Sequence, residues 1–293
     1  NGKILKNKIF DKIWIQPAAG DAGGSLGSAL ALWYNHMKKD RKVYEVDKMS
    51  GSYLGPEYSQ NEVENKLKEI GAKFEVMNEE DLIDKTAEEL SKGKAVGWFQ
   101  GRMEFGPRAL GARSILGDPR SESMQKDLNL KVKYRESFRP FAPSVLRDKV
   151  SDWFDDDIDS PYMLMTSQVK KNKLLKLHDN LELKGLDKLN IQRSKIPAVT
   201  HVDNSARIQT VDDKSNKKYL KLLRYFYKKT DCPVLINTSF NIRGEPIVQS
   251  PHDAFQCFMG TELDVLVIGN CILNKEEQEK ALIKDYRKKF KLD

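Results

Sequence analysis

Three arginines spaced among glycines form the segment of the sequence best suited to chemistry. Arg102, Arg108 and Arg113 lie within residues 101–120, GRMEFGPRALGARSILGDPR, directly after a short apolar run. Glycine lets backbone N–H groups approach a ligand closely, and a guanidinium group matches carboxylate or phosphate oxygens in a bidentate way. We therefore predict a loop that binds a small anion. A solvated basic loop is the simpler alternative, but surface loops seldom combine this many glycines and arginines with so few lysines.

A second group of cations follows in residues 131–143, KVKYRESFRPFAP. Lys133, Arg135 and Arg139 lie close together in this segment. Because the prolines at 140 and 143 disfavour a regular helix, we expect an extended segment that presents these charges. The alternative is an exposed strand edge on which lysine and arginine discourage aggregation.

Short polar side chains follow a predicted buried strand at residues 233–236. The run consists of Asn237, Thr238, Ser239, Phe240 and Asn241. Hydroxyl and amide groups at a strand end fix the orientation of ligands in nucleotide and phosphate sites. An ordinary Asx or Ser/Thr turn remains open as the alternative.

Two stretches contain carboxylates that raise the question of a metal. We predict a buried strand at residues 13–19, a glycine loop at 20–24 and a helix from about residue 25 to 39. Such a loop can receive a phosphate through free N–H groups, but Asp21 would repel it unless a metal ion lay between them. A tight structural turn is about as good an interpretation. Residues 155–159, DDDID, favour a solvated acidic turn, because the ligand spacing of a calcium loop does not follow.

The elements that must position these groups alternate between helix and strand. After an irregular stretch at residues 40–61, taken as a linker, we predict helices at 61–70 and 79–92 with a strand at 73–77 between them. A further helix is predicted near 219–229 and a buried strand at 263–268. This alternation indicates an α/β sheet with a ligand near strand ends. Residues 170–195 are rich in lysine and are interpreted as an exposed insertion or lid.

Composition limits the remaining possibilities. The 293 residues carry a net charge of +7, with 39% hydrophobic and 32% charged residues, as expected for a globular protein. The sequence contains no apolar run long enough to span a membrane and no signal peptide, so we expect a cytoplasmic location. The lysines are not interleaved with aromatic residues, which makes nucleic acid an unlikely partner. Cys232, Cys257 and Cys271 have neither disulfide nor zinc spacing and are expected to be core thiols.

Five segments together resemble the carbamoyltransferase family that includes the nodulation-factor, cephamycin and aminoglycoside O-carbamoyltransferases. They are QPAAGDAGGSLGSAL at 16–30, the arginine segment at 101–120, KYRESFRPFAPSVL at 133–146, VTHVDNSARIQTV at 199–211 and PVLINTSFNIRGEPIV at 233–248. The resemblance covers nearly the whole chain. It implies an N-terminal domain of the Kae1 and actin-like ATPase type joined to a YrdC-like domain, a twisted mixed sheet with flanking helices.

The resemblance also implies how the chain is divided. Residues 1–45 would be the last part of the Kae1-like domain, 46–60 a linker and 61–293 the complete YrdC-like domain. The chain begins at Asn1 rather than at a methionine, and we expect a fragment of a longer protein. Asp21 would help to hold an iron-type metal with histidines of the N-terminal domain. Because those histidines are absent here, the fragment is not expected to complete the transfer.

The same resemblance assigns roles to the basic and polar residues. In YrdC-like domains a Lys-x-Arg element and a Thr-Ser-x-Asn element bind ATP and the activated carbonyl substrate. The corresponding residues, with the others expected to line the pocket, are Lys133, Arg135, Thr238, Ser239, Asn241, Arg108, Arg139, Arg207 and Asn237, together with Arg102 and Arg113. Asn237 and Phe240 depart from the plain YrdC pattern, as the carbamoyltransferases do, and favour carbamoyl phosphate over threonine.

The implied reaction uses ATP, with Mg²⁺, and carbamoyl phosphate to form carbamoyl adenylate. The carbamoyl group would then pass to a hydroxyl of a sugar or natural product. Lys133, Arg139 and Arg108 are the residues expected to neutralise phosphate charge in this reaction. Two alternatives stay open: a threonylcarbamoyl-adenylate synthase that acts in tRNA modification, and an RNA-binding module of the YrdC type.

Overall fold

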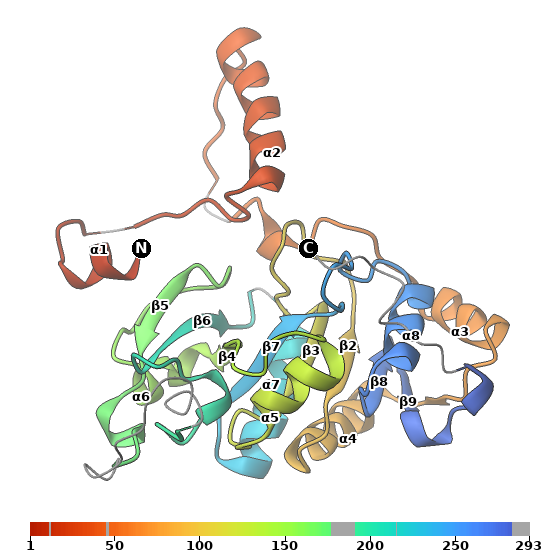
Figure 1. Ribbon diagram of the computed structural model, residues 1–293. Helices are drawn as coiled ribbons and strands as arrows, with labels where there is room; N and C mark the ends of the chain where they lie inside the picture. Colours follow the sequence, from red (N-terminus) through yellow and green to blue (C-terminus); the bar gives the residue numbers. More distant parts are fainter. Residues whose placement is uncertain (12, 45–46, 177–190, 215, 283–293) are drawn as a thin grey trace.

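The fold is built on one mixed sheet. The computed structural model describes residues 1–11, 13–44, 47–176, 191–214 and 216–282. Within these residues nine strands follow the order β1-β9-β8-β2-β3-β7-β4-β6-β5 (Figure 1). The pairs β2–β8 and β4–β6 are parallel, and the other neighbours are antiparallel. The prediction of an α/β protein with a mixed sheet is therefore confirmed.

The strands are short, and most of them are buried. Their bounds are β1 (Glu75–Val76), β2 (Val96–Phe99), β3 (Arg113–Gly117), β4 (Ala142–Leu146), β5 (Met165–Gln168), β6 (Ser205–Val211), β7 (Val234–Ser239), β8 (Val265–Ile268) and β9 (Cys271–Asn274). Strand β7 extends three residues beyond the predicted 233–236. Asn237, Thr238 and Ser239 therefore lie in the strand itself, because β3 pairs with all three of them and β4 also pairs with Asn237.

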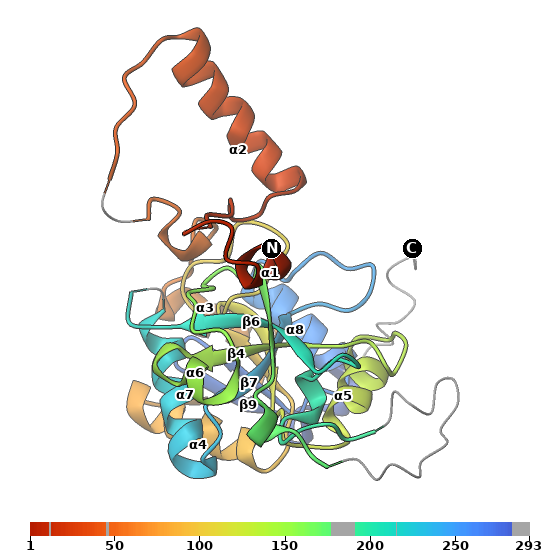
Figure 2. The ribbon, with the colours of Figure 1, turned by 90° about the vertical axis from the view of Figure 1, so that its left-hand side faces the viewer.

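Helices cover the sheet on both sides. The α-helices are α1 (Gly2–Lys6), α2 (Asp21–Ala31), α3 (Gln60–Glu69), α4 (Glu79–Ser91), α5 (Met124–Asp127), α6 (Val150–Trp153), α7 (Lys217–Thr230) and α8 (Pro251–Gly260). Shorter helical turns are η1 (Leu32–His36), η2 (Ser50–Ser52), η3 (Leu128–Val132), η4 (Arg147–Lys149), η5 (Lys171–Lys173), η7 (Pro197–Val199), η8 (Lys275–Glu277) and η9 (Lys280–Leu282). Figure 2 shows α4 and α7 on one side of the strands and α5 and α8 on the other.

Side-chain caps explain where the main helices begin. Ser59 and Ser250 each form a capping box, in which the hydroxyl accepts the backbone N–H of the third helical residue and the carboxylate of that residue accepts the N–H of the serine. Asn78 and Asn216 cap α4 and α7 through their side-chain oxygens. The predictions for α4 and α7 are confirmed to within about two residues. The helix predicted at 61–70 is α3, and it begins at Gln60 because Ser59 caps it.

The N-terminal part of the chain corrects the sequence analysis. Residues 13–20 form no strand in the described structure, and Trp14 is 76% exposed. Pro17 interrupts the run and cannot donate a hydrogen bond to a neighbouring strand, so the apolar residues alone were a misleading signal. Helix α2 begins at Asp21 instead of residue 25, and it buries none of its residues. Figures 1 and 2 show it projecting away from the sheet.

Two other interpretations are also revised or limited. Residues 131–143 are not one extended segment: η3 ends at Val132, a turn follows, and Pro143 lies inside β4.

Part of the lysine-rich stretch at 170–195 lies outside the described residues, and its described ends pair through Leu174 and Ser194. The acidic residues Asp157 and Asp159 both form ion pairs with Arg147.

The core confirms the expectation for the cysteines, since Cys232, Cys257 and Cys271 are free and buried. Among the described residues, no helix has the length and apolar character needed to cross a membrane.

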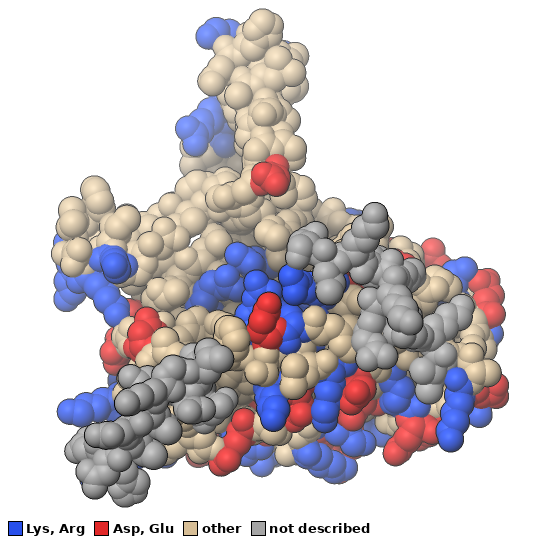
Figure 3. Space-filling model, viewed as in Figure 1, with Lys and Arg blue, Asp and Glu red and all other residues tan. Residues whose placement is uncertain are grey.

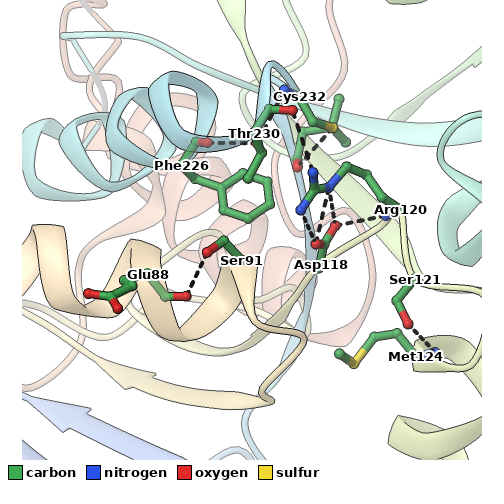
Figure 4. Close-up of polar contacts among 10 residues, drawn as sticks. Glu88, Ser91, Asp118, Arg120, Ser121, Met124, Phe226, Thr230 and Cys232 are labelled. Carbon is green, nitrogen blue, oxygen red and sulfur yellow. Dashed lines mark hydrogen bonds and ion pairs between the residues drawn. The ribbon is translucent and has the colours of Figure 1, made fainter.

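Asp118 and Arg120 form a charged clamp just after Gly117, the last residue of β3 (Figure 4). This end of β3 lies away from Ser239, which pairs with Ser114 at the other end. Arg120 donates from Nε to both oxygens of Asp118, and Nη2 lies 2.6 Å from Asp118 Oδ2. The guanidinium also lies over the ring of Phe226 in α7. This clamp joins the end of β3 to the helix layer beneath the sheet.

Candidate functional site

A small basic pocket lies where β7 ends. Its volume is about 140 Å³, and the residues that line it are Pro107, Arg108, Ala109, Arg135, Pro140, Phe141, Ala142, Met163, Arg207, Asn237, Thr238 and Ser239. They come from the arginine segment, the turn before β4 and the start of β4, the turn before β5, strand β6 and strand β7. Figure 3 shows Lys and Arg side chains gathered at the centre of this face, beneath the N-terminal segment.

The pocket is lined by three arginines and by no described carboxylate that would balance their positive charge. None of the described lining residues is acidic. Burial, and then the neighbouring Arg108, lower the pKa of Arg207, and Arg207 Nε is buried without a hydrogen-bond partner in the described structure. Burial, and then Arg139, lower the pKa of Arg135 to about 10. Cations held in this way favour binding of an anion, because its charge relieves their mutual repulsion and their poor solvation.

Lys133 is buried behind Ser239, which lines this pocket. Its ammonium group donates to the carbonyl and hydroxyl oxygens of Ser239 and to Asn241 O and Oδ1, the last at 2.8 Å. The Asn241 Oδ1 atom also accepts a hydrogen bond from the Ser239 hydroxyl at 2.7 Å. Burial, and then Arg135, lower the pKa of Lys133 to about 7. The predicted Lys-x-Arg and Thr-Ser-x-Asn elements thus meet at one place.

The floor of the pocket is a buried amide network centred on Asn237. Its Nδ2 donates to Ala109 O at 3.1 Å and to Gln209 Oε1 at 2.7 Å. Gln209 in turn donates from Nε2 to Leu110 O at 2.8 Å. These bonds tie strands β6 and β7 to the loop that carries Arg108.

The arginine loop is held at its base by Glu104. This buried carboxylate accepts the backbone N–H groups of Leu110 and Ala112 at 2.7 and 2.8 Å, and that of Arg113 at 3.3 Å. Burial raises the pKa of Glu104. Gly111 completes the turn with φ of +106°, at a position where a Cβ would come within 2.4 Å of the Tyr219 ring. The loop is therefore closed at both ends, and Arg108 lies near its middle.

Arg113 belongs to the buried interior of the protein and does not line the pocket. It is fully buried, and its guanidinium donates to the carbonyls of Gln100, Gly101, Ala112 and Pro56. It also lies 3.5 Å from the ring centroid of Phe99. Burial lowers its pKa to about 10. Because Arg113 is buried and is not among the residues that line the pocket, the expectation that it lines the substrate pocket is corrected.

Two other predicted residues lie outside the pocket lining. Arg102 is exposed, pairs with Glu57 at 3.5 Å and donates to Gly55 O. Arg139 is half-exposed, and its nearest carboxylate is that of Glu136, at 3.9 Å. The pocket thus unites Arg108, Arg135, Arg207, Asn237, Thr238 and Ser239, with Lys133 and Asn241 behind them, but not Arg102, Arg113 or Arg139.

Asp21 lies in the first turn of α2, in the projecting part of the chain. In the described residues no group of three or more His, Cys, Asp and Glu side chains is arranged to hold a metal ion. The metal role of Asp21 therefore stays a prediction for a longer protein.

A larger cavity of about 350 Å³ adjoins the basic pocket. The two share Pro140, and the larger one is lined by Phe138, Arg193 and His201 among other residues. Burial lowers the pKa of His201, and Arg207 of the basic pocket adds to this effect. The two cavities therefore lie side by side.

Sequence reasoning missed the residues that hold the site together. Glu104 lies in the quoted arginine segment, and Gln209 lies in the quoted run at 199–211, but neither was singled out. Tyr53 lies in the stretch taken as a linker, and its hydroxyl donates to Leu110 O at 2.8 Å. A glutamate four residues before Arg108, within a glycine-rich loop, was the one available signal, since buried carboxylates often bind loop N–H groups.

Comparison with known proteins gives the family. Residues 87–275 match the family model described as Carbamoyltransferase C-terminus. The chain is 54% identical, over its full length, to an uncharacterized protein of Synechocystis sp., of which it covers 48%. It is 39% identical to nodulation protein NolNO of Sinorhizobium fredii, over 94% of this chain and 38% of that protein.

A solved structure of full-length HypF in the phosphate- and nucleotide-bound form is similar over 66% of this chain and 20% of that one, with 16% identity and a TM-score of 0.39. So small a likeness carries no argument. The chain spans about half or less of the length of these curated relatives. The match to the family model and the identity to the relatives show that the chain belongs to the carbamoyltransferase family, of which it carries the C-terminal region.

Proposed function

We propose that this chain forms carbamoyl adenylate from carbamoyl phosphate and ATP, as the adenylating part of a longer O-carbamoyltransferase. The observation that carries the proposal is the acid-free pocket in which Arg108, Arg135 and Arg207 converge beside the hydroxyls of Thr238 and Ser239. Guanidinium forks and hydroxyl groups suit phosphate oxygens. Membership of the carbamoyltransferase family supports the carbamoyl group as the cargo.

The volumes of the two cavities support a division of the substrates. A pocket of about 140 Å³ suits a ligand the size of carbamoyl phosphate and is small for a whole nucleotide. The adjoining cavity of about 350 Å³, with Phe138 and Pro140 on its walls, offers room for a nucleoside. In this proposal the phosphates of ATP lie near the junction of the two cavities.

The proposed reaction has two steps. Water cleaves the phosphorus–oxygen bond of carbamoyl phosphate and gives carbamate and dihydrogen phosphate. A carbamate oxygen then bonds to the α-phosphorus of ATP, and the bond to pyrophosphate breaks. The role of the arginines is to hold two anions in line and to neutralise their charge, so no side chain needs to act as a nucleophile.

Mg²⁺ would accompany ATP and supply further charge neutralisation. Because none of the described residues lining the pocket is acidic, its ligands would be phosphate oxygens and water, as is usual for this ion. Transfer of the carbamoyl group to an acceptor hydroxyl, an iron-type metal held with the help of Asp21, and a Kae1-like origin of residues 1–45 belong to the same proposal for the longer protein.

Pyrophosphate release tests the proposed function. The chain is incubated with ATP and Mg²⁺, and carbamoyl phosphate is compared with threonine plus bicarbonate. We expect release with carbamoyl phosphate and none with threonine. Release with threonine alone would instead identify a threonylcarbamoyl-adenylate synthase. If neither donor gives release while an RNA oligonucleotide binds, the binding-module alternative is favoured.

A further inference from the structure

Residues 52–56, Ser-Tyr-Leu-Gly-Pro, form a strap along the start of the arginine loop. The Gly55 N–H donates to Met103 O at 2.9 Å, and the Met103 N–H donates to Pro56 O at 3.0 Å. The two backbones lie so close that a Cβ at Gly55 would come within 2.9 Å of Met103. A segment that only joined two domains would need no such pairing with a ligand-binding loop.

The turn that leads into the strap has an unusual backbone. Ser50, Gly51 and Ser52 have φ values of +49°, +68° and +67°. Residues other than glycine persist in this left-handed region only where surrounding contacts hold them, and such positions concentrate at functional sites. One of the contacts that hold this turn is the hydrogen bond from the Phe105 N–H to Ser52 O, at 2.6 Å.

Tyr53 extends from the strap to the wall of the basic pocket. Its side chain packs against a small buried cluster of Leu110, Ala142 and Met163. Ala142 and Met163 line the pocket, although no residue of the strap does so itself. The strap therefore contacts the pocket from behind, through one aromatic side chain.

The hydroxyl of Tyr53 holds a carbonyl of the arginine loop. It donates to Leu110 O at 2.8 Å, and the same oxygen accepts Gln209 Nε2 at 2.8 Å. Burial, and then the carboxylate of Glu104, raise the pKa of Tyr53, so its hydroxyl stays a donor. Leu110 follows Arg108 by two residues, and Arg108 is exposed. The position of Arg108 therefore depends on the backbone that Tyr53 and Gln209 hold.

We infer that Tyr53 is a positioning residue of the basic pocket, which holds the Leu110 carbonyl, and with it Arg108, where a bound anion needs them. The inference rests on the anion pocket of the proposed function. When the arginine loop is in place in only a fraction of the molecules, the apparent affinity for the anion falls by that fraction. Because coupling between two parts of a protein is reciprocal, a bound anion should in turn stabilise the strap.

Phosphate affinity without ATP tests the role of the Tyr53 hydroxyl. Isothermal titration compares inorganic phosphate on the wild-type chain and on Tyr53→Phe, which keeps the ring and removes the donor. We expect binding to weaken by about three- to tenfold, the range that one hydrogen bond implies. A folded Tyr53→Phe protein that binds phosphate as tightly as the wild type overturns the inference.

Tyr225→Phe is the matched control. The Tyr225 hydroxyl donates to Glu80 at 2.7 Å between α7 and α4, away from the strap. Its loss removes a hydrogen bond of similar length and should leave phosphate affinity unchanged. If the two variants weakened phosphate binding equally, the effect of Tyr53 would be a general loss of stability, and the inference would be wrong.

Hydrogen exchange of the wild type supplies a readout that a merely structural role would not move. Saturating phosphate should slow exchange of the Gly55 and Met103 N–H groups, which bind no ligand, by about the factor lost in Tyr53→Phe. In Tyr53→Phe this slowing should disappear. Exchange in the strap that is the same with and without phosphate in the wild type overturns the inference, and this arm holds even if the variant does not fold.

The two proposals can fail separately. If the wild type binds phosphate and Tyr53→Phe weakens it, but no pyrophosphate is released with any donor, the proposed reaction fails and the role of Tyr53 stands. If the wild type does not bind phosphate, the anion pocket fails and the inference fails with it.

Discussion

Lys133 is the residue of the site whose charge depends most on what the pocket contains. Its pKa of about 7 reflects burial and the nearby Arg135, without a compensating ion pair in the described residues. An amine with a lowered pKa is mostly neutral above that pKa, and an anion bound nearby raises the pKa again. The protonation of Lys133 should therefore follow the occupancy of the pocket.

This gives a prediction for proton uptake. Above pH 7, binding of inorganic phosphate should be accompanied by uptake of a large fraction of a proton, because the bound anion raises the pKa of Lys133. Titration calorimetry at pH 8 in two buffers with different ionisation enthalpies measures that uptake. Lys133→Met should abolish it. Identical heats in both buffers for the wild type would contradict the prediction.

The arginines divide into those that face the pocket and those that do not. Arg108→Gln and Arg207→Gln should each weaken phosphate binding by about tenfold or more, since each removes a charge-assisted contact. Arg102→Gln is the control, because Arg102 is exposed and pairs with Glu57. If phosphate affinity fell equally in all three variants, the anion would be attracted by the overall positive charge of the protein and not bound in the pocket.

At the residue level the sequence indicated which side chains could bind an anion, but not which of them face the pocket. Clustered arginines and short polar groups can be recognised locally, and most of them do meet in the pocket. Whether an arginine faces a ligand or the core depends on contacts far along the chain. Arg113 turned inward because the carbonyl of Pro56, 57 residues earlier, accepts one of its hydrogen bonds, and no local pattern reveals such a partner.

Among the elements, the closed loop from Glu104 to Arg113 carries the strongest prediction. Glu104→Ala leaves the N–H groups of Leu110 and Ala112 without their acceptor, so the free energy of unfolding should fall by about 2–4 kcal/mol. Phosphate affinity should fall as well, because Arg108 loses its fixed position. Chemical denaturation and titration calorimetry measure the two effects. Glu104→Gln keeps one oxygen for the same N–H groups and should retain most of both.

The clamp at the other end of β3 provides the comparison. Asp118→Asn should lower the free energy of unfolding by about 1 kcal/mol, a modest effect because Arg120 is partly exposed. Its distance along the strand from the pocket means that phosphate affinity should not change. Loss of affinity in this variant would show that Glu104→Ala acts through general loosening of the sheet instead of through the loop.

The elements themselves were predictable where local signals agreed. Helices α4 and α7 combine an Asn cap with an apolar face, and both were found within about two residues. The strand at 13–19 failed because a strand also needs a neighbour, and apolar composition does not supply one. The sequence did not reveal that residues 46–60, taken as a linker, contact the arginine loop. These contacts are backbone hydrogen bonds between residues far apart in the chain, such as that from Gly55 N to Met103 O, and they leave no pattern in the sequence.

At the scale of the molecule, charge bears on the choice of partner. The net charge is +7, and on the face that Figure 3 shows, acidic and basic side chains are mixed apart from the central basic area. A short RNA should therefore bind weakly at physiological salt, and with a shallow salt dependence, because few phosphates would be neutralised together. Fluorescence anisotropy over a salt series measures this. Tight binding with a steep slope would favour the RNA-binding module.

The position of β7 in the sheet has a consequence for how the site behaves when a ligand arrives. Asn237 lies on a strand that is hydrogen-bonded on both sides, by β3 and by β4, whereas Arg108 lies on a loop outside the sheet, to which single hydrogen bonds from Asn237 and Gln209 attach it at Ala109 and Leu110. Backbone amides of β7 should exchange with deuterium only at the rate of global unfolding, with or without phosphate, and those around Arg108 should slow when phosphate binds. The floor of the pocket would then lose almost no conformational entropy on binding, and the entropic cost would fall on a few residues of a single wall.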